Sequence, residues 1–276
     1  MEETKCHTYY ADGPGTQATR SYPKSVCKDL CTGAARTAPL SGWKKWGKFP
    51  SDKLIQDALK VGLYLEVWEK KTSPPVIAVV FRGTTSLKDW ISNMHWVLRF
   101  VPFIKDQYIF VSRKVGEEFV NHLANKLKNE SAYSKGVCIV ATGHSLGGGL
   151  AQHLAYSLPL KSSNGIPVQR VSSVFAFNPS PITGWFTLIC NSKLRTINTK
   201  RLKIERIFEH GEILAFIRLL LRYVYPPGVR EIRYNFVKSK NPFKSHSMRL
   251  MACALIKASG QVHPPHLFDD LFRDHK

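Results

Sequence analysis

The feature that most constrains the fold is the sequence Gly-His-Ser-Leu-Gly at residues 143–147, together with what stands on either side of it. Residues 137–142 form a short, continuous apolar run, which is typical of a strand buried on both faces. Residues 147–158 then carry apolar side chains at helical spacing. A serine between a buried strand and a helix is expected to occupy a strained turn that exposes its hydroxyl. The two glycines are needed because a Cβ at either position would collide with the neighbouring strand or helix.

The rest of the chain alternates strand patterns with helix patterns. Ser51 as N-cap and Gly62 as terminator predict a helix over 52–60. Strands are predicted at 63–68, 75–81, 171–177, 202–208 and 229–237, and further helices at 114–127 and 247–258. This alternation predicts an α/β fold. Residues 1–50 have no clear periodicity, so we expect an irregular N-terminal lead-in followed by one domain over 51–276.

The chain of 276 residues carries 40 Lys and Arg against 20 Asp and Glu, a formal net charge of +20. With 43% apolar residues, it can bury one sizeable core. The charge indicates anionic partners, either nucleic acid or an acidic membrane surface. Nucleic acid is not expected, because the sequence holds no helix-turn-helix, zinc module or aromatic strand motif. It also holds no calcium loop or His/Cys cluster, and no metal or other cofactor is expected.

A second motif precedes the serine: Phe-Arg-Gly-Thr-Thr-Ser-Leu-Lys-Asp-Trp at residues 81–90. In their order and spacing, the two motifs resemble those of the class 3 lipase family, and the resemblance extends over about residues 60–250. It implies an α/β-hydrolase fold with a mostly parallel central sheet flanked by helices. It also implies an oxyanion hole in which Thr84 supplies a hydroxyl and an N–H, and Leu146 supplies a second N–H.

The same resemblance implies a mobile lid just downstream of the oxyanion turn, from residue 86 to about residue 96. Leu87, Trp90 and Ile91 are the expected lid side chains. The stretch 90–104 is far more apolar than a surface loop should be, which fits a lid that offers this face to lipid. A buried strand or helix is the alternative explanation of the same apolar run.

A serine hydroxyl needs a base, and the base needs an acid that holds it in the right tautomer. In α/β-hydrolases the chain order is serine, acid, histidine, so both partners are expected after Ser145. His246 follows a predicted strand across a polar loop and precedes an apolar helix, which matches where the family carries its base. His263 and His266, in a proline-rich tail, are the alternatives.

Glu212 is the predicted acid. It lies in the segment 208–214, which closes a strand and resembles the family segment in which an Asp precedes two apolar residues. Glu in place of Asp is a departure from that pattern, and it requires a slightly retracted backbone. Glu209 is the first alternative, followed by Asp269 and Asp270.

These residues predict acyl transfer, in which Ser145 attacks an ester carbonyl, His246 takes and returns the proton, and Glu212 orients the imidazole. The positive charge favours phospholipid over neutral fat, so an A-type phospholipase is the first expectation. A neutral acylglycerol lipase and an acyltransferase with the same triad are the alternatives within this chemistry. A non-catalytic, lipase-like scaffold that binds lipid or a partner is the alternative outside it.

Two basic segments are expected to meet an anionic membrane. Residues 193–206 hold six bases and one acid, and residues 213–223 combine an apolar surface with Arg218 and Arg222, four residues apart. The alternatives are a solvated face for the first segment and an ordinary core helix for the second.

The N-terminus begins with acids and lacks an apolar run, so no export signal is expected, and no apolar stretch is long enough to span a bilayer. A basic lipase domain without such a signal is similar to bacterial phospholipase effectors delivered by contact-dependent secretion. The similarity implies synthesis in the cytoplasm, action at a target membrane, and an inhibitor or delivery protein as partner. An intracellular lipase is the alternative.

Overall fold

The computed structural model describes residues 6–7, 21–22, 42–83, 107–184, 188, 192–215, 229–236, 241–248, 250–252 and 254–255. The chain divides into two compact units. The larger consists of Gly42–Phe208 and Leu214–Tyr234. The smaller consists of Met1–Ser41, Glu209–Ile213 and Asn235–Lys276, and it includes an antiparallel pair of short strands, β1 (Cys6–His7) and β2 (Ser21–Tyr22).

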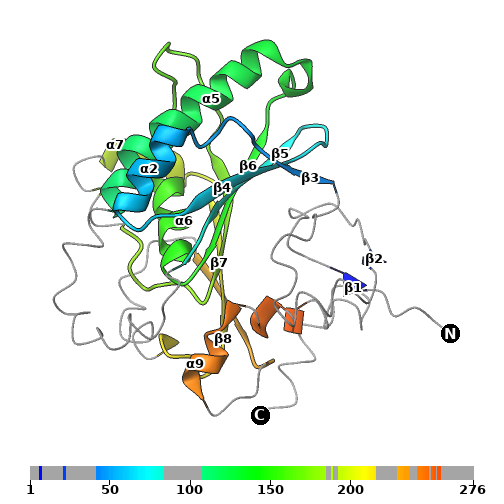
Figure 1. Ribbon diagram of the computed structural model, residues 1–276, viewed down its shortest axis with the longest axis vertical. Coiled ribbons are helices and arrows are strands. Elements are labelled where there is room, and N and C mark those ends of the chain that lie inside the picture. Colours follow the sequence, from blue (N-terminus) through cyan, green and yellow to red (C-terminus); the bar gives the residue numbers. More distant parts are fainter. Residues whose placement is uncertain are drawn as a thin grey trace. The chain divides into compact units, whose positions relative to one another are not determined.

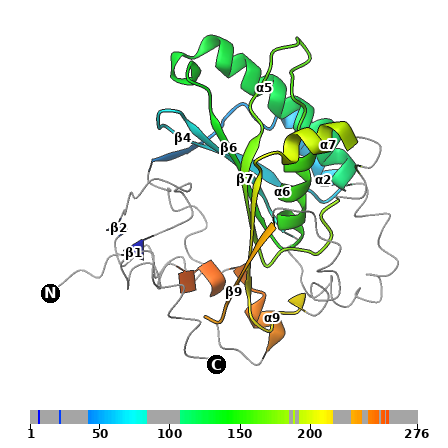
Figure 2. The same cartoon turned by 180° about the vertical axis from the view of Figure 1, so that it is seen from behind.

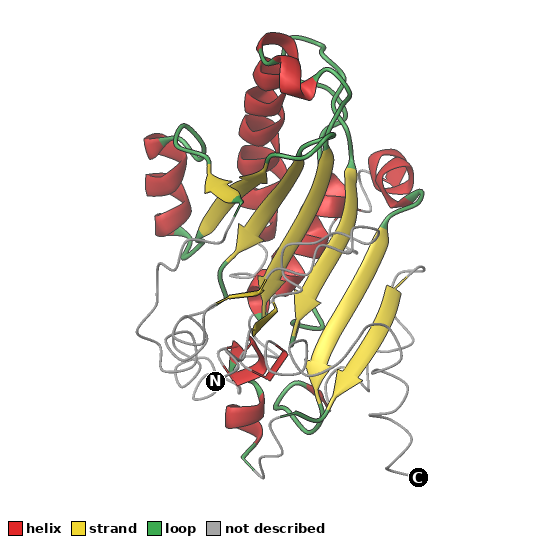
Figure 3. Cartoon of the chain, turned by 90° about the vertical axis from the view of Figure 1, so that its right-hand side faces the viewer, coloured by secondary structure: helices red, strands yellow, loops and turns green. Residues whose placement is uncertain are grey.

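A seven-stranded mixed sheet forms the centre of the larger unit (Figure 1). Its strands lie in sequence order: β3 (Trp43–Lys45), β4 (Leu65–Lys70), β5 (Val76–Phe81), β6 (Cys138–His144), β7 (Val171–Phe177), β8 (Lys203–Glu209) and β9 (Val229–Tyr234). β3, β4 and β5 pair antiparallel, whereas β5, β6, β7 and β8 pair parallel, and Figure 3 shows them side by side. A sheet that is parallel at its centre and covered by helices confirms the predicted fold class.

The helices of the larger unit gather on one side of this sheet (Figures 1 and 2). α6 (Leu146–Ser157) packs directly on β5, β6 and β7. α7 (Ser192–Thr199) and a π-helical turn (Val111–Val115), which leads into α5 (Gly116–Asn129), pack against α6. Every residue of α6 after its first is therefore buried.

Local sequence signals account for the first helix and the first hairpin. α2 (Asp52–Lys60) starts at the predicted cap, where the N–H of Leu54 donates to the Ser51 hydroxyl at 3.2 Å. It ends before Gly62, whose φ of +68° is readily adopted only by glycine. β4 and β5 form the predicted hairpin.

The apolar face of α2 is only partly covered. Leu54, Ile55, Ala58 and Leu59 share one side of the helix, but only Leu54 and Ala58 are buried. Ile55 is 41% exposed and Leu59 is 45% exposed. The apolar stripe is therefore wider than the surface that the fold covers.

Several elements are not predicted by the sequence patterns. β1, β2 and β3 lie within the stretch 1–50, where no strand is predicted, and β3 is recognised as a strand by its pairing with β4. α7 has only two apolar residues, Leu194 and Ile197, and α9 (Pro242–Ser245) is a single turn, so neither carries an extended apolar pattern. α7 is joined to its neighbour by the side-chain amide of Asn198, which donates to the carbonyl oxygens of Tyr156 and Leu158 at 3.1 and 2.9 Å.

Two predicted helices are described only in part. Of the apolar segment 213–225, the structure describes residues 213–215, so Arg218 and Arg222 lie outside the described residues. Of the predicted helix 247–258, residues 248, 250–252 and 254–255 are helical, and Met251 is fully buried.

Candidate active site

Ser145 lies at a sharp turn that joins β6 to α6. The strand ends at His144 and the helix begins at Leu146, so the chain reverses direction at a single residue. The backbone angles of Ser145 are φ 56° and ψ −123°, a conformation that costs a residue with a Cβ about 1–3 kcal/mol. The strained turn predicted for this serine is therefore present.

The glycines on either side of Ser145 make this turn possible. A Cβ at Gly143 would lie 2.3 Å from the carbonyl oxygen of Gly147. A Cβ at Gly147 would lie 2.4 Å from the carbonyl oxygen of Phe81, at the end of β5. Both contacts are with backbone atoms, which cannot rotate away, so strand and helix approach this closely only because side chains are missing, as the motif predicts.

The backbone of Ser145 is held on both sides. Its N–H donates to the carbonyl oxygen of Phe177, the last residue of β7, at 2.9 Å. Its carbonyl oxygen accepts bonds from the N–H of Gly148 at 3.0 Å and of Ser180 at 2.9 Å. The side chain of this serine is thus carried by a fixed backbone rather than by a free loop.

The turn after β5 lies against the serine. A Cβ at Gly83 would stand 2.5 Å from the carbonyl oxygen of His144 and 3.4 Å from the Cβ of Ser145. The preceding residue, Arg82, is tied to the residue just before β4, because its N–H donates to the carbonyl oxygen of Tyr64 at 3.0 Å. The segment 82–83 is therefore placed where a donor group could face the serine hydroxyl.

The predicted oxyanion and lid residues are only partly described. Leu146 opens α6, and the first N–H groups of a helix have no partner within the helix, so they can stabilise negative charge. Thr84 lies outside the described residues, as do Leu87, Trp90 and Ile91.

Glu212 and His246 form a hydrogen-bonded pair in the smaller unit. His246 Nδ1 and Glu212 Oε2 are 2.5 Å apart, and the side chains are 1% and 0% exposed. Glu212 stands in the turn after β8, next to Gly211 at φ +70°. His246 directly follows α9, and its N–H donates to the carbonyl oxygen of Pro242 at 3.2 Å. Folding thus joins two residues that are 34 positions apart, while Ser145 belongs to the larger unit.

Of the alternative acids and bases, the structure describes only Glu209. Glu209 is the last residue of β8 and is buried. His263, His266, Asp269 and Asp270 all lie outside the described residues.

His153 is a buried histidine of α6 that packs against an aromatic ring. The Tyr108 ring meets it edge to face, with ring centroids 5.0 Å apart. Burial lowers the pKa of His153 to about 4, although the backbone of Tyr108, Gly184 and Thr183 opposes the shift. A Cβ at Gly184 would lie 2.3 Å from Nδ1, so the chain passes very close to the ring. The side chain is therefore neutral at neutral pH and contributes to packing.

Arg206 corrects the expectation that all six bases of 193–206 lie on the surface. Its side chain is 1% exposed, and its Nε and Nη2 both donate to Gln152 Oε1, at 3.0 and 2.8 Å. Gln152 in turn donates to the carbonyl oxygen of Gly148, in the first turn of α6. Glu231 of β9 lies 3.9 Å from Nη1. This base joins β8 to the helix that follows the serine and is not available to a membrane.

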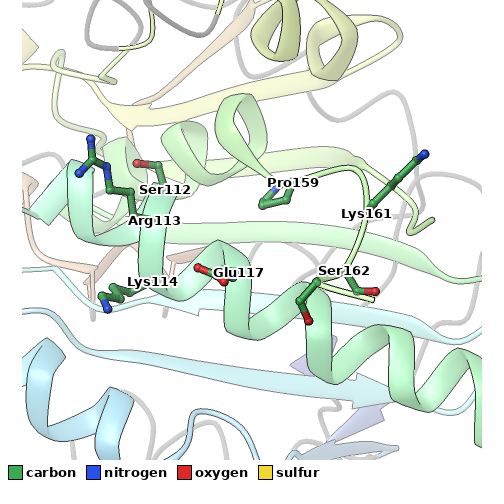
Figure 4. A pocket seen from close by; sticks show the side chains of 8 residues that line it. Ser112, Arg113, Lys114, Glu117, Pro159, Lys161 and Ser162 are labelled. Atoms are coloured by element: carbon green, nitrogen blue, oxygen red, sulfur yellow. The ribbon is translucent and has the colours of Figure 1, made fainter. Parts of the chain in front are cut away.

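A surface groove lies between the start of α5 and the loop that follows α6, away from the serine turn (Figure 4). It is lined by Ser112, Arg113, Lys114, Glu117, Pro159, Lys161, Ser162 and Ser163. The side chains of Arg113 and Lys161 point away from one another, so the cations do not converge on a common ligand.

Among the residues that the structure describes, no cluster of three or more His, Cys, Asp or Glu side chains could hold a metal ion. No helix in the described part of the chain is long and apolar enough to cross a membrane.

A serine at a one-residue turn between a central parallel strand and a buried helix, in a mixed sheet covered by helices, defines the class of protein: an α/β-hydrolase. Residues 78–206 match the family model for lipase (class 3), a stretch that runs from β5 through the serine turn to β8. The resemblance to class 3 lipases is thereby confirmed, and this match supports a lipid ester hydrolase.

Similar solved structures include two of the Rhizomucor miehei lipase propeptide complex. The native complex has a TM-score of 0.44 at 15% identity, covering 84% of this chain and 72% of that one. A deletion mutant of the complex has a TM-score of 0.43 at 14% identity, covering 88% and 80%. A Pyrococcus furiosus esterase has a TM-score of 0.31 at 13% identity, covering 63% and 77%. No curated protein sequence matches the chain.

Proposed function

We propose that the protein hydrolyses membrane phospholipids by acyl transfer, with Ser145 as nucleophile, His246 as base and Glu212 as the acid that orients the base. The observation that carries the proposal is the buried hydrogen bond between His246 Nδ1 and Glu212 Oε2. A buried histidine and carboxylate in contact are the two parts that a serine nucleophile requires.

The pair fixes the tautomer of the imidazole. When Nδ1–H donates to the Glu212 carboxylate, Nε2 is left with a lone pair that can accept a proton. Nε2 takes the proton from the Ser145 hydroxyl as Oγ attacks the ester carbonyl, and it returns that proton to the leaving alcohol. The Glu212 carboxylate stabilises the imidazolium that forms between these steps.

The tetrahedral intermediate carries its negative charge on the former carbonyl oxygen. The N–H of Leu146 and the hydroxyl and N–H of Thr84 are its proposed donors. A lid containing Leu87, Trp90 and Ile91 is proposed to cover the site when no lipid is bound, and to open at a lipid surface. Water then hydrolyses the acyl-enzyme and frees Ser145 for another turnover.

Phospholipid is the proposed substrate class because of the charge of the chain. A net charge of +20 attracts the protein to anionic bilayers, whereas neutral acylglycerol offers no such attraction. An inhibitor or delivery protein would keep a phospholipase from the membranes of the cell that makes it. Such a protein is the proposed partner.

The triad is tested with a soluble short-chain nitrophenyl ester, which needs no membrane. Ser145→Ala and His246→Ala should each lower turnover by about 10⁶-fold, because the two residues act as one unit. Circular dichroism would show whether each variant is folded. Hydrolysis by folded Ser145→Ala protein at the wild-type rate would exclude this serine as the nucleophile.

The substrate class is tested by mass spectrometry of the products from vesicles that contain both phospholipid and triacylglycerol, with Ser145→Ala protein as the control. Lysophospholipid and free fatty acid would support the A-type phospholipase. Diacylglycerol with intact phospholipid would identify a neutral lipase, and new esters would identify an acyltransferase. If the protein hydrolyses neither the soluble ester nor either lipid, a non-catalytic scaffold is favoured.

A further inference from the structure

Three of the four large apolar side chains that are exposed in the described part of the chain lie within ten residues of one another. Ile55 and Leu59 are four residues apart on α2, and Tyr64 stands just before β4. Ile55 is 41% exposed, and Leu59 and Tyr64 are each 45% exposed. The fourth, Ile197, lies on α7. Scattered exposed apolar residues are normal, whereas neighbouring apolar residues that are exposed together, as Ile55 and Leu59 are on α2, are typical of interaction sites.

This group lies at the same edge of the sheet as the nucleophile. Leu65 pairs with Phe81 across β4 and β5, and Phe81 pairs with Gly143 across β5 and β6. Tyr64 and Ser145 are therefore just beyond the same edge, two strand spacings apart, or about 10 Å sideways.

The end of α2 is fixed to this edge as well. The N–H of Leu63 donates to the carbonyl oxygen of Ala58 at 2.8 Å, and that of Gly62 donates to the carbonyl oxygen of Leu59 at 3.0 Å. The side-chain amide of Gln107 donates to the carbonyl oxygen of Val61 at 2.6 Å. The exposed apolar side chains are thus held on a rigid part of the structure.

Basic side chains flank the group at the edge that carries the serine. Lys60 and Arg82 are exposed there, whereas the acids Asp52 and Glu118 lie at the other end of α2, where Glu118 accepts hydrogen bonds from Ser51. Asp57 is paired with Lys60 at 2.8 Å, and the Lys60 ammonium holds the pKa of Asp57 below its usual value. The Arg82 guanidinium lies over the Tyr64 ring, 5.3 Å from its centroid, so a cation and an aromatic ring stand together at the edge.

We propose that Ile55, Leu59 and Tyr64, with Lys60 and Arg82 at their margin, form a docking surface for a phospholipid bilayer beside the catalytic serine. The inference rests on the proposed function, whose phospholipid substrate lies in a bilayer. Apolar side chains that enter the headgroup region next to basic residues are the usual means of interfacial binding. A protein partner is a poorer fit, because three side chains are far fewer than the 20–30 residues that each side of a stable interface typically contributes.

The experiment measures binding and leaves catalysis aside. Ser145→Ala protein is sedimented with vesicles of equimolar phosphatidylcholine and phosphatidylglycerol, and with vesicles of phosphatidylcholine alone. In this background, Ile55→Ser with Leu59→Ser should lower the partition coefficient about tenfold or more on both kinds of vesicle. Ile197→Ser, the matched control, replaces an equally exposed side chain on α7 and should leave the partition coefficient unchanged.

A second variant makes the test independent of any loss of folding. Leu59→Trp should raise the partition coefficient severalfold, because tryptophan favours the membrane interface. Unchanged binding by both α2 variants, or an equal loss in Ile197→Ser, would overturn the proposal. A dimer in size-exclusion chromatography that the α2 double variant dissociates would instead assign the surface to a second copy of the chain. An inactive triad would leave these binding results unaffected, so the two proposals fail separately.

Discussion

At the scale of single residues, the serine turn depends on glycines, because these residues have no Cβ. Ser145 holds a strained backbone conformation because β6, α6 and the end of β5 meet within contact distance of one another. Gly143, Gly147 and Gly83 are the three points of closest approach, and at each the obstruction is a backbone carbonyl oxygen. A side chain could move aside, but these backbone atoms cannot, so the turn tolerates no substitution there.

Gly143→Ala should therefore destabilise the fold by about 3 kcal/mol or more, because the added Cβ would lie 2.3 Å from the Gly147 carbonyl oxygen. Gly47→Ala is the matched control, since no atom lies within 4 Å of a Cβ at that position. Urea unfolding of the two variants measures the difference. Equal stability of both variants would show that the turn can rearrange.

Glu212→Gln tests the role of the carboxylate without changing its shape. The amide cannot stabilise an imidazolium in the way that a carboxylate does, so turnover of a soluble ester should fall by about 10⁴-fold while the fold is kept. Glu209→Gln is the control, since this residue is the first alternative acid. A larger loss in Glu209→Gln than in Glu212→Gln would transfer the proposed role to Glu209.

His153 links stability to pH. Burial lowers its pKa from 6.5 to about 4, so between these pH values the unfolded chain binds a proton that the folded chain does not bind. The free energy of unfolding should therefore fall by up to about 3 kcal/mol as the pH drops through this window, with the full stability kept above it. His153→Gln should flatten this part of the pH profile in urea unfolding. An identical profile would show that other groups control acid unfolding.

At the scale of elements, the helix after the serine is positioned by buried polar contacts as well as by apolar packing. Arg206 of β8 holds Gln152, and Gln152 holds the Gly148 carbonyl oxygen in the first turn of α6. At the other end of the helix, Asn198 of α7 satisfies the carbonyl oxygens of Tyr156 and Leu158. Both ends of α6 are therefore joined to neighbouring elements.

Arg206→Met should keep the apolar part of the side chain while leaving Gln152 Oε1 without its donors. A buried polar group that loses its partner costs about 1–3 kcal/mol, so the thermal midpoint should fall. Arg230→Met, on an exposed side chain, is the control and should have little effect. Equal midpoints for the two variants would mean that the buried network does not stabilise α6.

At the scale of the whole molecule, charge is distributed unevenly. No Asp or Glu occurs between Glu130 and Glu205. In the larger unit, four bases of that stretch lie where β8 starts: Arg170 contacts the carbonyl oxygen of Ile197, and Lys200, Arg201 and Lys203 follow α7. Parallel strands begin at this edge and end at the edge that carries Ser145, so this basic group and the serine are a strand length apart.

That distance decides which charges act at the proposed membrane contact. A strand of seven residues is about 23 Å long, whereas the Debye length is about 8 Å at physiological salt. Lys200→Gln with Arg201→Gln should therefore leave turnover on anionic vesicles unchanged at physiological salt. The variant should nevertheless elute earlier from a cation exchanger, because the net charge is lower. A severalfold loss of vesicle turnover would place the membrane contact at the α7 edge.

The sequence by itself determined the parts of the fold that depend on neighbours along the chain. The cap at Ser51, the β4–β5 hairpin and the strand, turn and helix around Ser145 are local structures, and their glycines and apolar spacing predict them directly. The choice of Glu212 and His246 also came from the sequence, through the family resemblance, and their catalytic roles stay predictions.

Only the tertiary structure decided which side chains are covered. Arg206 looks like a surface base and is buried, because β8 lies next to the helix that carries Gln152. Leu59 looks like a core residue and is exposed, because the fold covers only part of the α2 stripe. The contact between Glu212 and His246 has the same origin: no spacing rule brings together residues 34 positions apart. Burial and long-range contacts depend on how elements pack, and packing is not encoded in any single stretch of sequence.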